Sequence, residues 1–221
     1  MKSKPAKFAA ALAAIVLIAW IGVPRLLVAL GLHPHHEIPP MDLAGRRALV
    51  VTTSQATLGD GGKATGVFAS ELTVPYYAFT DAGMAVDVAS IKGGPIPIEP
   101  GSRGWPIASD ADRRSLADPD FDSKVQHSLA IASVDARVYD IVFLAGGWGA
   151  AYDLGQSEAL GGKVSEAYAN GAVVGGVCHG PLGLLQAKAP DGTPLVRGRR
   201  ISAVTDKQIE ELGITFTPMH P

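Results

Sequence analysis

The sequence has a single cysteine, Cys178, among its 221 residues. One cysteine excludes an intrachain disulfide and any zinc site that is built from several thiolates. Charged residues make up only 18% of the chain and the formal net charge is −2, so the sequence gives no electrostatic basis for binding nucleic acid. Internal repeats and low-complexity tracts are also absent. The length of the chain is enough for one domain with an appendage.

The apolar residues of the chain are concentrated at its N-terminus. An uncharged run covers residues 8–23, and a second apolar patch at residues 26–32 extends it. This length is enough to cross a bilayer, and a helix that is apolar on every face is not typical of a soluble core. The sequence therefore predicts a single-pass transmembrane signal anchor over residues 1–32. The positive charges that precede the run are Lys2, Lys4 and Lys7.

Those lysines place the N-terminus in the cytoplasm and the domain on the non-cytoplasmic side of the membrane. The alternative is a secretory signal peptide that is removed, because lysines before an alanine-rich run are typical of such peptides too. A convincing small-residue cleavage site is not present in the sequence.

A short proline-rich linker is expected over residues 33–43. It contains His33, His35, His36 and Glu37, which could attract a metal ion. A structural zinc site needs four placed ligands, and no further ligand follows in this segment. We therefore expect neither a metal site nor a cofactor.

The remainder of the chain, residues 44–221, alternates between strand and helix patterns. Such alternation is typical of a doubly wound α/β domain, flavodoxin-like, with a parallel sheet between helices. Active sites in these sheets lie at the carboxyl ends of the strands. Strands are expected at residues 46–53, 84–90, 139–145, 172–177 and 200–204, and helices within residues 62–82, 118–135, 156–169 and 181–187.

The pattern around Cys178 predicts a nucleophile elbow. An apolar, β-branched strand leads into the cysteine, His179 follows at once, and a Gly-Pro pair precedes a leucine-rich run. The N–H groups at the start of a new helix and its dipole favour a thiolate, so a depressed thiol pKa is expected. The alternative is that Cys178 is only a small buried hydrophobic residue.

Three motifs lie in this domain: Cys178-His179-Gly180-Pro181, the glycine loop at residues 146–149, and Glu71 within residues 65–75. Together they resemble the ThiJ/PfpI superfamily, whose fold is that of the class I glutamine amidotransferases. Residues 86–102 are similar to the branch that holds glutathione-independent glyoxalase III enzymes and heat-shock chaperones. The resemblance covers about residues 44–221.

The resemblance implies a role for each motif. Cys178 is the nucleophile, His179 the general acid or base, and Glu71 the carboxyl that lies against the sulfur. Gly147 and Gly149 lack side chains, so their backbone N–H groups can approach an oxyanion closely. Without the resemblance, Glu71 is an ordinary glutamate on a helix surface and His179 can be a structural histidine.

The chain departs from this branch at three places. Trp148 stands where the branch usually carries histidine, which adds bulk to the rim of the substrate site. Ile209 stands where the branch places the acid that orients the histidine, so Asp206 and Glu210 are the remaining candidates for that acid. The sequence ends soon after Gly213, so we expect a domain that is truncated at its C-terminus or completed by another polypeptide.

The resemblance implies a cofactor-free conversion of α-oxoaldehydes such as methylglyoxal to hydroxy acids. A stress chaperone or redox sensor of the same superfamily, an amidase, and a catalytically inert membrane-anchored domain are the alternatives. The expected partners are a small carbonyl substrate, the membrane and a second copy in a homodimer, and no nucleic acid is expected. The dimer follows from an apolar strip expected near residues 212–216.

Overall fold

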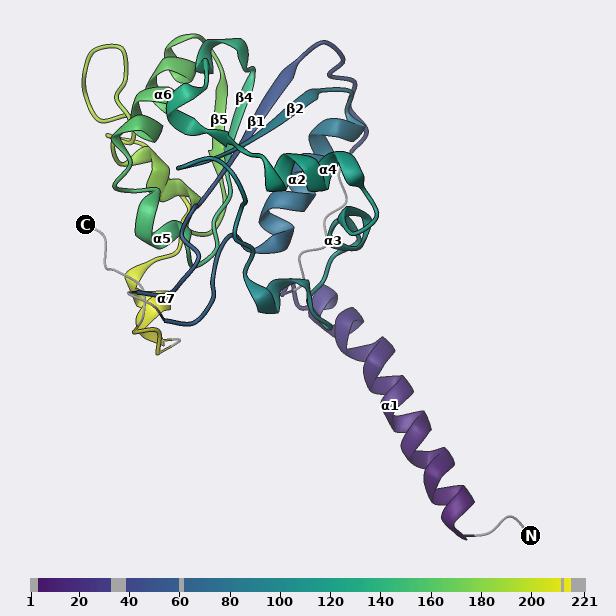
Figure 1. The fold of residues 1–221 in the computed structure, drawn as a ribbon. Coiled ribbons are helices and arrows are strands. Elements are labelled where there is room, and N and C mark those ends of the chain that lie inside the picture. Colours follow the sequence, from purple (N-terminus) through teal and green to yellow (C-terminus); the bar gives the residue numbers. More distant parts are fainter. Residues whose placement is uncertain (1–3, 33–38, 60–61, 212, 216–221) are drawn as a thin grey trace.

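A five-stranded parallel sheet forms the centre of the domain in the computed structural model, which describes residues 4–32, 39–59, 62–211 and 213–215 (Figure 1). The strand order is β3-β2-β1-β4-β5, and every pairing is parallel. This confirms the predicted doubly wound α/β fold. The strands are β1 (Arg47–Thr52), β2 (Ala85–Ser90), β3 (Leu129–Ala130), β4 (Ile141–Leu144) and β5 (Val173–Gly176).

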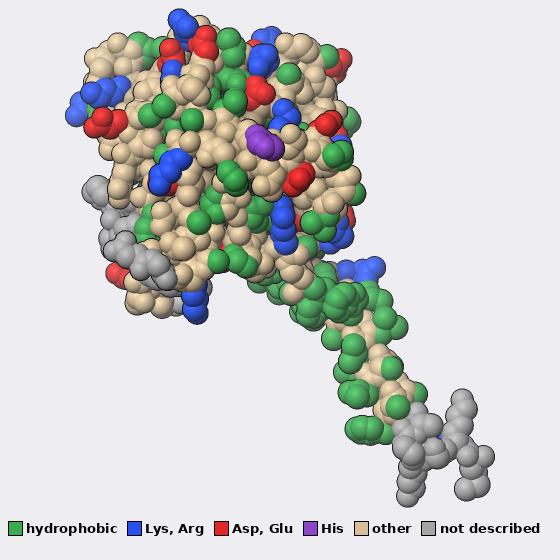
Figure 2. Space-filling model, in the orientation of Figure 1, with side chains coloured by type: hydrophobic (Ala, Val, Ile, Leu, Met, Phe, Trp, Pro, Cys, Tyr) green, Lys and Arg blue, Asp and Glu red, His purple; other side chains and the backbone are tan. Residues whose placement is uncertain are grey.

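The helix α1 (Lys4–Ala29) extends away from this domain (Figure 1). Its segment Lys7–Ala29 is 23 residues long, with a mean hydropathy of 2.3 and none of its most apolar window buried. By length and composition the helix could cross a membrane. Apolar side chains line it up to its junction with the domain (Figure 2).

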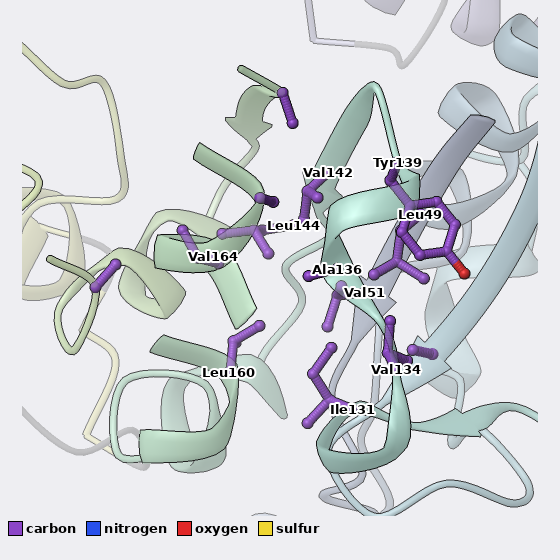
Figure 3. Close-up of a cluster of buried hydrophobic side chains, with 14 of the residues drawn as sticks. Leu49, Val51, Ile131, Val134, Ala136, Tyr139, Val142, Leu144, Leu160 and Val164 are labelled. Carbon is purple, nitrogen blue, oxygen red and sulfur yellow. The ribbon is translucent and has the colours of Figure 1, made fainter. Parts of the chain in front are cut away.

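The two faces of the sheet are covered by different helices because side chains alternate along each strand. Ala48 and Val50 point to a core beneath α2 (Ala69–Asp81) and α4 (Pro119–Gln126). Leu49 and Val51 point to the opposite core, beneath α6 (Glu158–Ala169), which Figure 3 shows. Both faces of the central strand are therefore apolar, as a parallel sheet requires.

The shorter helices close the domain. The N-terminus of α3 (Asp110–Ser115) has a capping box, in which Ser109 and Asp112 exchange hydrogen bonds. The other short elements are α5 (Ala150–Asp153), α7 (Asp206–Glu211) and the 3₁₀ helices η1 (Pro100–Arg103), η2 (Ile131–Ser133), η3 (Ala136–Val138) and η4 (Gly180–Leu184).

Two predicted elements differ in the structure. The helix expected at residues 181–187 is the 3₁₀ helix η4, which is held tightly against the sheet. The strand expected at residues 200–204 is wrong, because a strand needs a neighbour and this segment donates only the Val204 N–H, 3.2 Å from the Cys178 carbonyl. Residues 213–215 form no strand either, since the Ile214 N–H turns back to the Ile209 carbonyl.

Several expectations concern residues that the structure does not describe. The histidine cluster of the linker and most of the predicted apolar strip, including Leu212 and Phe216, lie outside the described residues, and Ile214 is half-buried. Exposed apolar side chains lie instead at and beyond the edge strand β5, on Val173, Val177 and Ile201.

Two adjacent glycines of α6 provide a test of this packing. A Cβ on Gly161 would lie 2.4 Å from the Gln186 Cβ and 2.7 Å from its carbonyl carbon, whereas a Cβ on Gly162 would meet nothing within 4 Å. Alanine improves helix propensity at both positions, so Gly162→Ala should stabilise the chain by up to ~1 kcal/mol. Gly161→Ala should destabilise it by ~1–3 kcal/mol, because the segment after η4 must move. Denaturant unfolding of both variants measures the difference, and equal free energies of unfolding would contradict the packing.

Candidate active site

Cys178 lies on a sharp turn directly after β5. Its φ is 56°, and among the described residues it is the one non-glycine residue with a positive φ. Such a backbone is strained for an L-residue, and strain of this kind is typical of functional sites. Gly180 allows the turn to pack closely against β4, because a Cβ at this position would lie 2.0 Å from the Leu144 carbonyl oxygen. The predicted nucleophile elbow is therefore present.

The elbow lies at the carboxyl end of the sheet, where the strand order reverses. From β1 the chain extends through β2 on one side and through β4 and β5 on the other. Ligands of open α/β sheets bind at this switch point. Three separate segments meet here: the elbow after β5, the glycine loop after β4 and the first turn of α2.

His179 is buried next to Cys178. Its Nδ1 lies 3.4 Å from the Cys178 Sγ, so a proton can pass between the two groups. The indole of Trp148 lies beside the imidazole, with ring centroids 5.3 Å apart. The structure thus brings Trp148 to the rim of the site, where its bulk was expected.

Glu71 reaches the same place from the first turn of α2. Its Oε2 accepts a hydrogen bond of 2.9 Å from the Gly146 N–H, and its carboxyl is hydrogen-bonded to the Cys178 thiol. Burial raises the pKa of Glu71 to about 7, against the opposing effect of these hydrogen bonds. The carboxyl that the family resemblance placed against the sulfur therefore does lie there, and it titrates near neutral pH.

The thiol pKa differs from the sequence-based expectation. Burial raises the pKa of Cys178 to about 12, and the neighbouring Glu71 carboxylate raises it further. The backbone N–H groups of Gly147 and His179 act in the opposite direction but do not prevail. The prediction of a depressed pKa was wrong because burial of the thiol, reinforced by the charge of Glu71, outweighs the N–H groups at the start of the helix. The raised pKa favours the protonated form of the Cys178 thiol at neutral pH, with the Glu71 carboxyl in contact with it.

The two glycines of the predicted oxyanion loop have different roles. Gly147 has a φ of 91°, and a Cβ on it would lie 2.4 Å from the Phe68 backbone nitrogen. Its N–H is directed to both the Cys178 sulfur and the Glu71 carboxyl. The Gly149 N–H instead donates to the Gly66 carbonyl at 3.2 Å. The geometry therefore favours Gly147, and not Gly149, as an oxyanion donor.

A buried carboxylate behind the loop was not anticipated from the sequence. Asp153 of α5 accepts hydrogen bonds of 2.8 Å from the Thr53 hydroxyl and the Ser54 N–H. Burial raises the pKa of Asp153. A Cβ on Gly149 would lie 2.8 Å from the Thr53 Cγ2, so Asp153 holds the end of β1 against the glycine loop. A Tyr-Asp pair in a short segment gives no signal for this role.

The candidates for a third acid lie elsewhere. Asp206 and Glu210 are both exposed on α7, and neither side chain is hydrogen-bonded or ion-paired with a described residue. Ile209 between them is buried. Nor do the described residues contain a group of three or more His, Cys, Asp or Glu side chains that could hold a metal ion.

The fold and this site define a class of α/β proteins with a cysteine on a nucleophile elbow and a glutamate against its sulfur. The family model of the DJ-1/PfpI family matches residues 63–208. The chain therefore belongs to the DJ-1/PfpI family.

Several relatives are named for one activity. The chain is 33% identical to glutathione-independent glyoxalase HSP31 of Saccharomyces cerevisiae, over 78% of this chain and 74% of that protein. It is 30% identical to glutathione-independent glyoxalase hsp3102 of Schizosaccharomyces pombe, over 77% and 73%. Among solved structures, glyoxalase III of Candida albicans matches with a TM-score of 0.69 and 28% identity, over 77% and 72% of the two chains.

The Cys178–Glu71 contact predicts an unusual alkylation profile. At a pH above about 7 Glu71 is ionised and its negative charge raises the pKa of the Cys178 thiol, so iodoacetamide should react slowly with Cys178. Glu71→Gln removes the negative charge and should speed alkylation about tenfold or more at pH 8–9, since each unit of thiol pKa changes the thiolate fraction tenfold. Glu166→Gln, which removes a carboxylate next to Lys163, is the control and should leave the rate unchanged. Slower alkylation of Glu71→Gln would mean that the carboxyl stabilises the thiolate.

Proposed function

We propose that this protein converts α-oxoaldehydes such as methylglyoxal to hydroxy acids, without glutathione and with Cys178 as the nucleophile. The contact between the Cys178 thiol and the Glu71 carboxyl carries the proposal, because it places a base of suitable pKa against a nucleophile. The named activity of the relatives supports the same chemistry.

The first step is addition of the thiol to the aldehyde. A bond forms between Sγ and the aldehyde carbon, the carbonyl π pair moves to oxygen, and the thiol proton passes to the Glu71 carboxylate. The Gly147 N–H faces the sulfur and is the donor for the developing oxyanion. Protonation of that oxygen completes a hemithioacetal.

The second step moves a proton between the two carbons of the substrate. A base removes the proton on the sulfur-bearing carbon, and the enediol is protonated at the adjacent carbon, which gives a thioester. His179 and Glu71 are the groups within reach for both transfers. Water then cleaves the thioester to a hydroxy acid and regenerates the Cys178 thiol. No redox partner is needed, because the aldehyde carbon is oxidised as the ketone carbon is reduced.

The thiol pKa also bears on the redox-sensor alternative. Sensor cysteines are exposed thiolates of low pKa. Cys178 is half-buried and protonated, so the catalytic role is favoured over a sensor.

We further propose that α1 anchors the protein in a membrane, with the domain on the non-cytoplasmic side. The support is the length and apolar surface of Lys7–Ala29 and the lysines that precede it.

A homodimer is also proposed. Its support is the exposed apolar side chains at the β5 edge, since such edges favour association.

The activity has a defined pH dependence. Glu71 must be ionised to accept the thiol proton, so kcat/KM for methylglyoxal without glutathione should rise as the pH increases through about 7. Cys178→Ala should abolish D-lactate formation, and Glu71→Gln should lower kcat about 10²–10⁴-fold and remove this pH dependence. Glu166→Gln should match the natural sequence. Turnover by Cys178→Ala would refute the nucleophile, and a rate that falls as the pH increases through 7 would refute the role of Glu71 as base.

The membrane proposal is tested by fractionation. The full chain should remain with membranes after carbonate extraction, and its domain should be digested by protease added from the non-cytoplasmic side. Deletion of residues 1–40 should release the domain to the soluble fraction. Recovery of a soluble protein whose N-terminus lies near residue 33 would show a cleaved signal peptide instead.

A further inference from the structure

A cavity of about 930 Å³ lies where α1 meets the domain. One wall belongs to α1 and includes Trp20, Pro24 and Arg25. The other wall is formed by the segment that leads from η1 to α3 and includes Arg103, Trp105 and Arg113. The volume is in the range of small-molecule sites, and nothing in the proposed catalytic mechanism uses this region.

A proline in α1 lies next to the contact between this helix and the domain. Residue 24 would normally donate its N–H to the carbonyl of residue 20, but Pro24 has no N–H. The indole Nε1 of Trp105 donates to that Trp20 carbonyl instead, at 3.1 Å. The two indole rings also stack, with centroids 5.0 Å apart and planes 3° from parallel. The domain therefore satisfies a backbone group that the helix itself leaves without a partner.

The cavity is positively charged. Arg113 is partly neutralised by Asp110, and its guanidinium also donates to the Ala108 carbonyl at 2.8 Å. Arg25 and Arg103 have no ion pair with any described residue. The lining therefore carries three arginines against one aspartate. Basic side chains are visible on the domain surface next to the end of α1 (Figure 2).

The depth of the cavity in a bilayer follows from helix length. Residues 8–19, before the first contact with the domain, span only about 18 Å, while the hydrocarbon core is about 30 Å thick. The helix can cross the core only if its docked part, from Trp20 onward, also enters the membrane. A core of about 30 Å that begins at residue 8 ends near residue 27, so the α1 wall of the cavity lies in the outer part of the core and at its boundary. Indoles are favoured at this boundary, and long arginine side chains can extend from it to the headgroups.

We propose that this cavity binds the phosphate headgroup of an anionic phospholipid. The guanidinium groups of Arg103 and Arg113 hold the phosphate, because a planar guanidinium matches its geometry. The acyl chains lie along the apolar side chains of Ile21 and Val28 on α1. The proposal rests on the membrane anchor proposed above and is independent of the glyoxalase activity.

The test uses the full chain in nanodiscs of phosphatidylcholine and phosphatidylglycerol, in which one lipid at a time has brominated acyl chains. A Trp148→Phe background limits the fluorescence to Trp20 and Trp105. Brominated phosphatidylglycerol should quench this fluorescence more strongly than brominated phosphatidylcholine at equal mole fraction. We expect an enrichment on the order of fivefold for each arginine that reaches the headgroup. Arg103→Gln with Arg113→Gln should make the two lipids equal.

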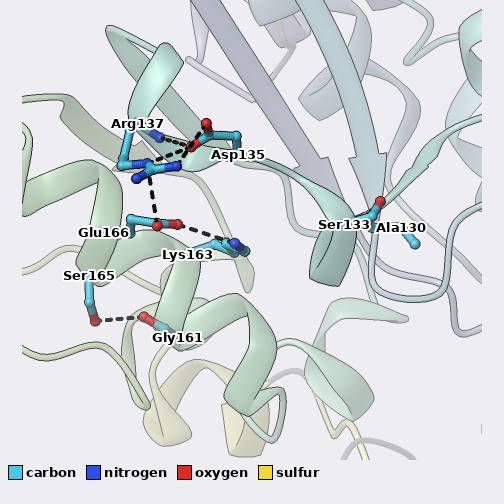
Figure 4. A network of polar contacts seen from close by, with 8 residues as sticks. All are labelled: Ala130, Ser133, Asp135, Arg137, Gly161, Lys163, Ser165 and Glu166. Atoms are coloured by element: carbon cyan, nitrogen blue, oxygen red, sulfur yellow. Dashed lines mark hydrogen bonds and ion pairs between the residues drawn. The ribbon is translucent and has the colours of Figure 1, made fainter.

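The matched control is Arg137→Gln, which removes an arginine that is paired with Asp135 (Figure 4). This pair lies next to α6, which is far from α1 (Figure 1). It should keep the preference for phosphatidylglycerol. Equal quenching by both lipids in the natural sequence would overturn the lipid site and leave the anchor intact. Loss of the preference on adding inorganic phosphate would assign the cavity to a free anion and overturn the proposal. Quenching by neither lipid would overturn the site and the anchor together, while methylglyoxal turnover, measured on the chain that retains Trp148, would still test the proposed glyoxalase activity.

Discussion

The site depends on the contact between two acidic groups, the Glu71 carboxyl and the Cys178 thiol. The Glu71 carboxyl and the Cys178 thiol lie in contact, so their charges oppose each other and only one of them ionises near neutral pH. The carboxylate is the ionised group, because a Gly146 N–H supports it and its ordinary pKa is lower. In the proposed mechanism the nucleophile and the base are therefore a preassembled pair, and the proton moves from Cys178 to Glu71 when a substrate arrives. This differs from cysteine enzymes that keep a resting thiolate.

The fold positions this pair through close backbone contacts. A Cβ on Gly146 would lie 2.6 Å from the Glu71 Oε2 and 2.7 Å from the His179 backbone nitrogen. The loop after β4 therefore fits between these two groups only if residue 146 is glycine. Gly147 is held as closely against the start of α2. The strained turn at Cys178 is stabilised by the same packing, because β4 and β5 fix both of its ends.

Much of this could be predicted from the sequence, and the exceptions share a cause. Buried strands such as β1 can be predicted because their sequences are apolar runs. The elbow can be predicted because an apolar strand leads directly into Cys-His-Gly-Pro. Residues 200–204 have strand composition but no neighbouring strand among the described residues, which local sequence cannot reveal. The raised thiol pKa depends on Glu71, 107 positions away along the chain, whose inward orientation is set by the fold. Asp153 likewise acts on β1 across the sheet.

The protonated thiol also has a consequence for where the domain can work. Oxidation to sulfenic and sulfinic acids proceeds from the thiolate, so the raised pKa of the half-buried Cys178 thiol disfavours oxidation when no substrate is bound. A resting thiolate would be vulnerable outside the cytoplasm, where reducing systems do not maintain free thiols. A base that ionises near pH 7 and takes the proton only during addition combines reactivity with this protection. The Glu71–Cys178 pair is thus suited to the non-cytoplasmic location proposed for the domain, because in the proposed mechanism the thiolate forms only as it attacks the substrate, and the resting thiol reacts more slowly with oxidants than a thiolate does.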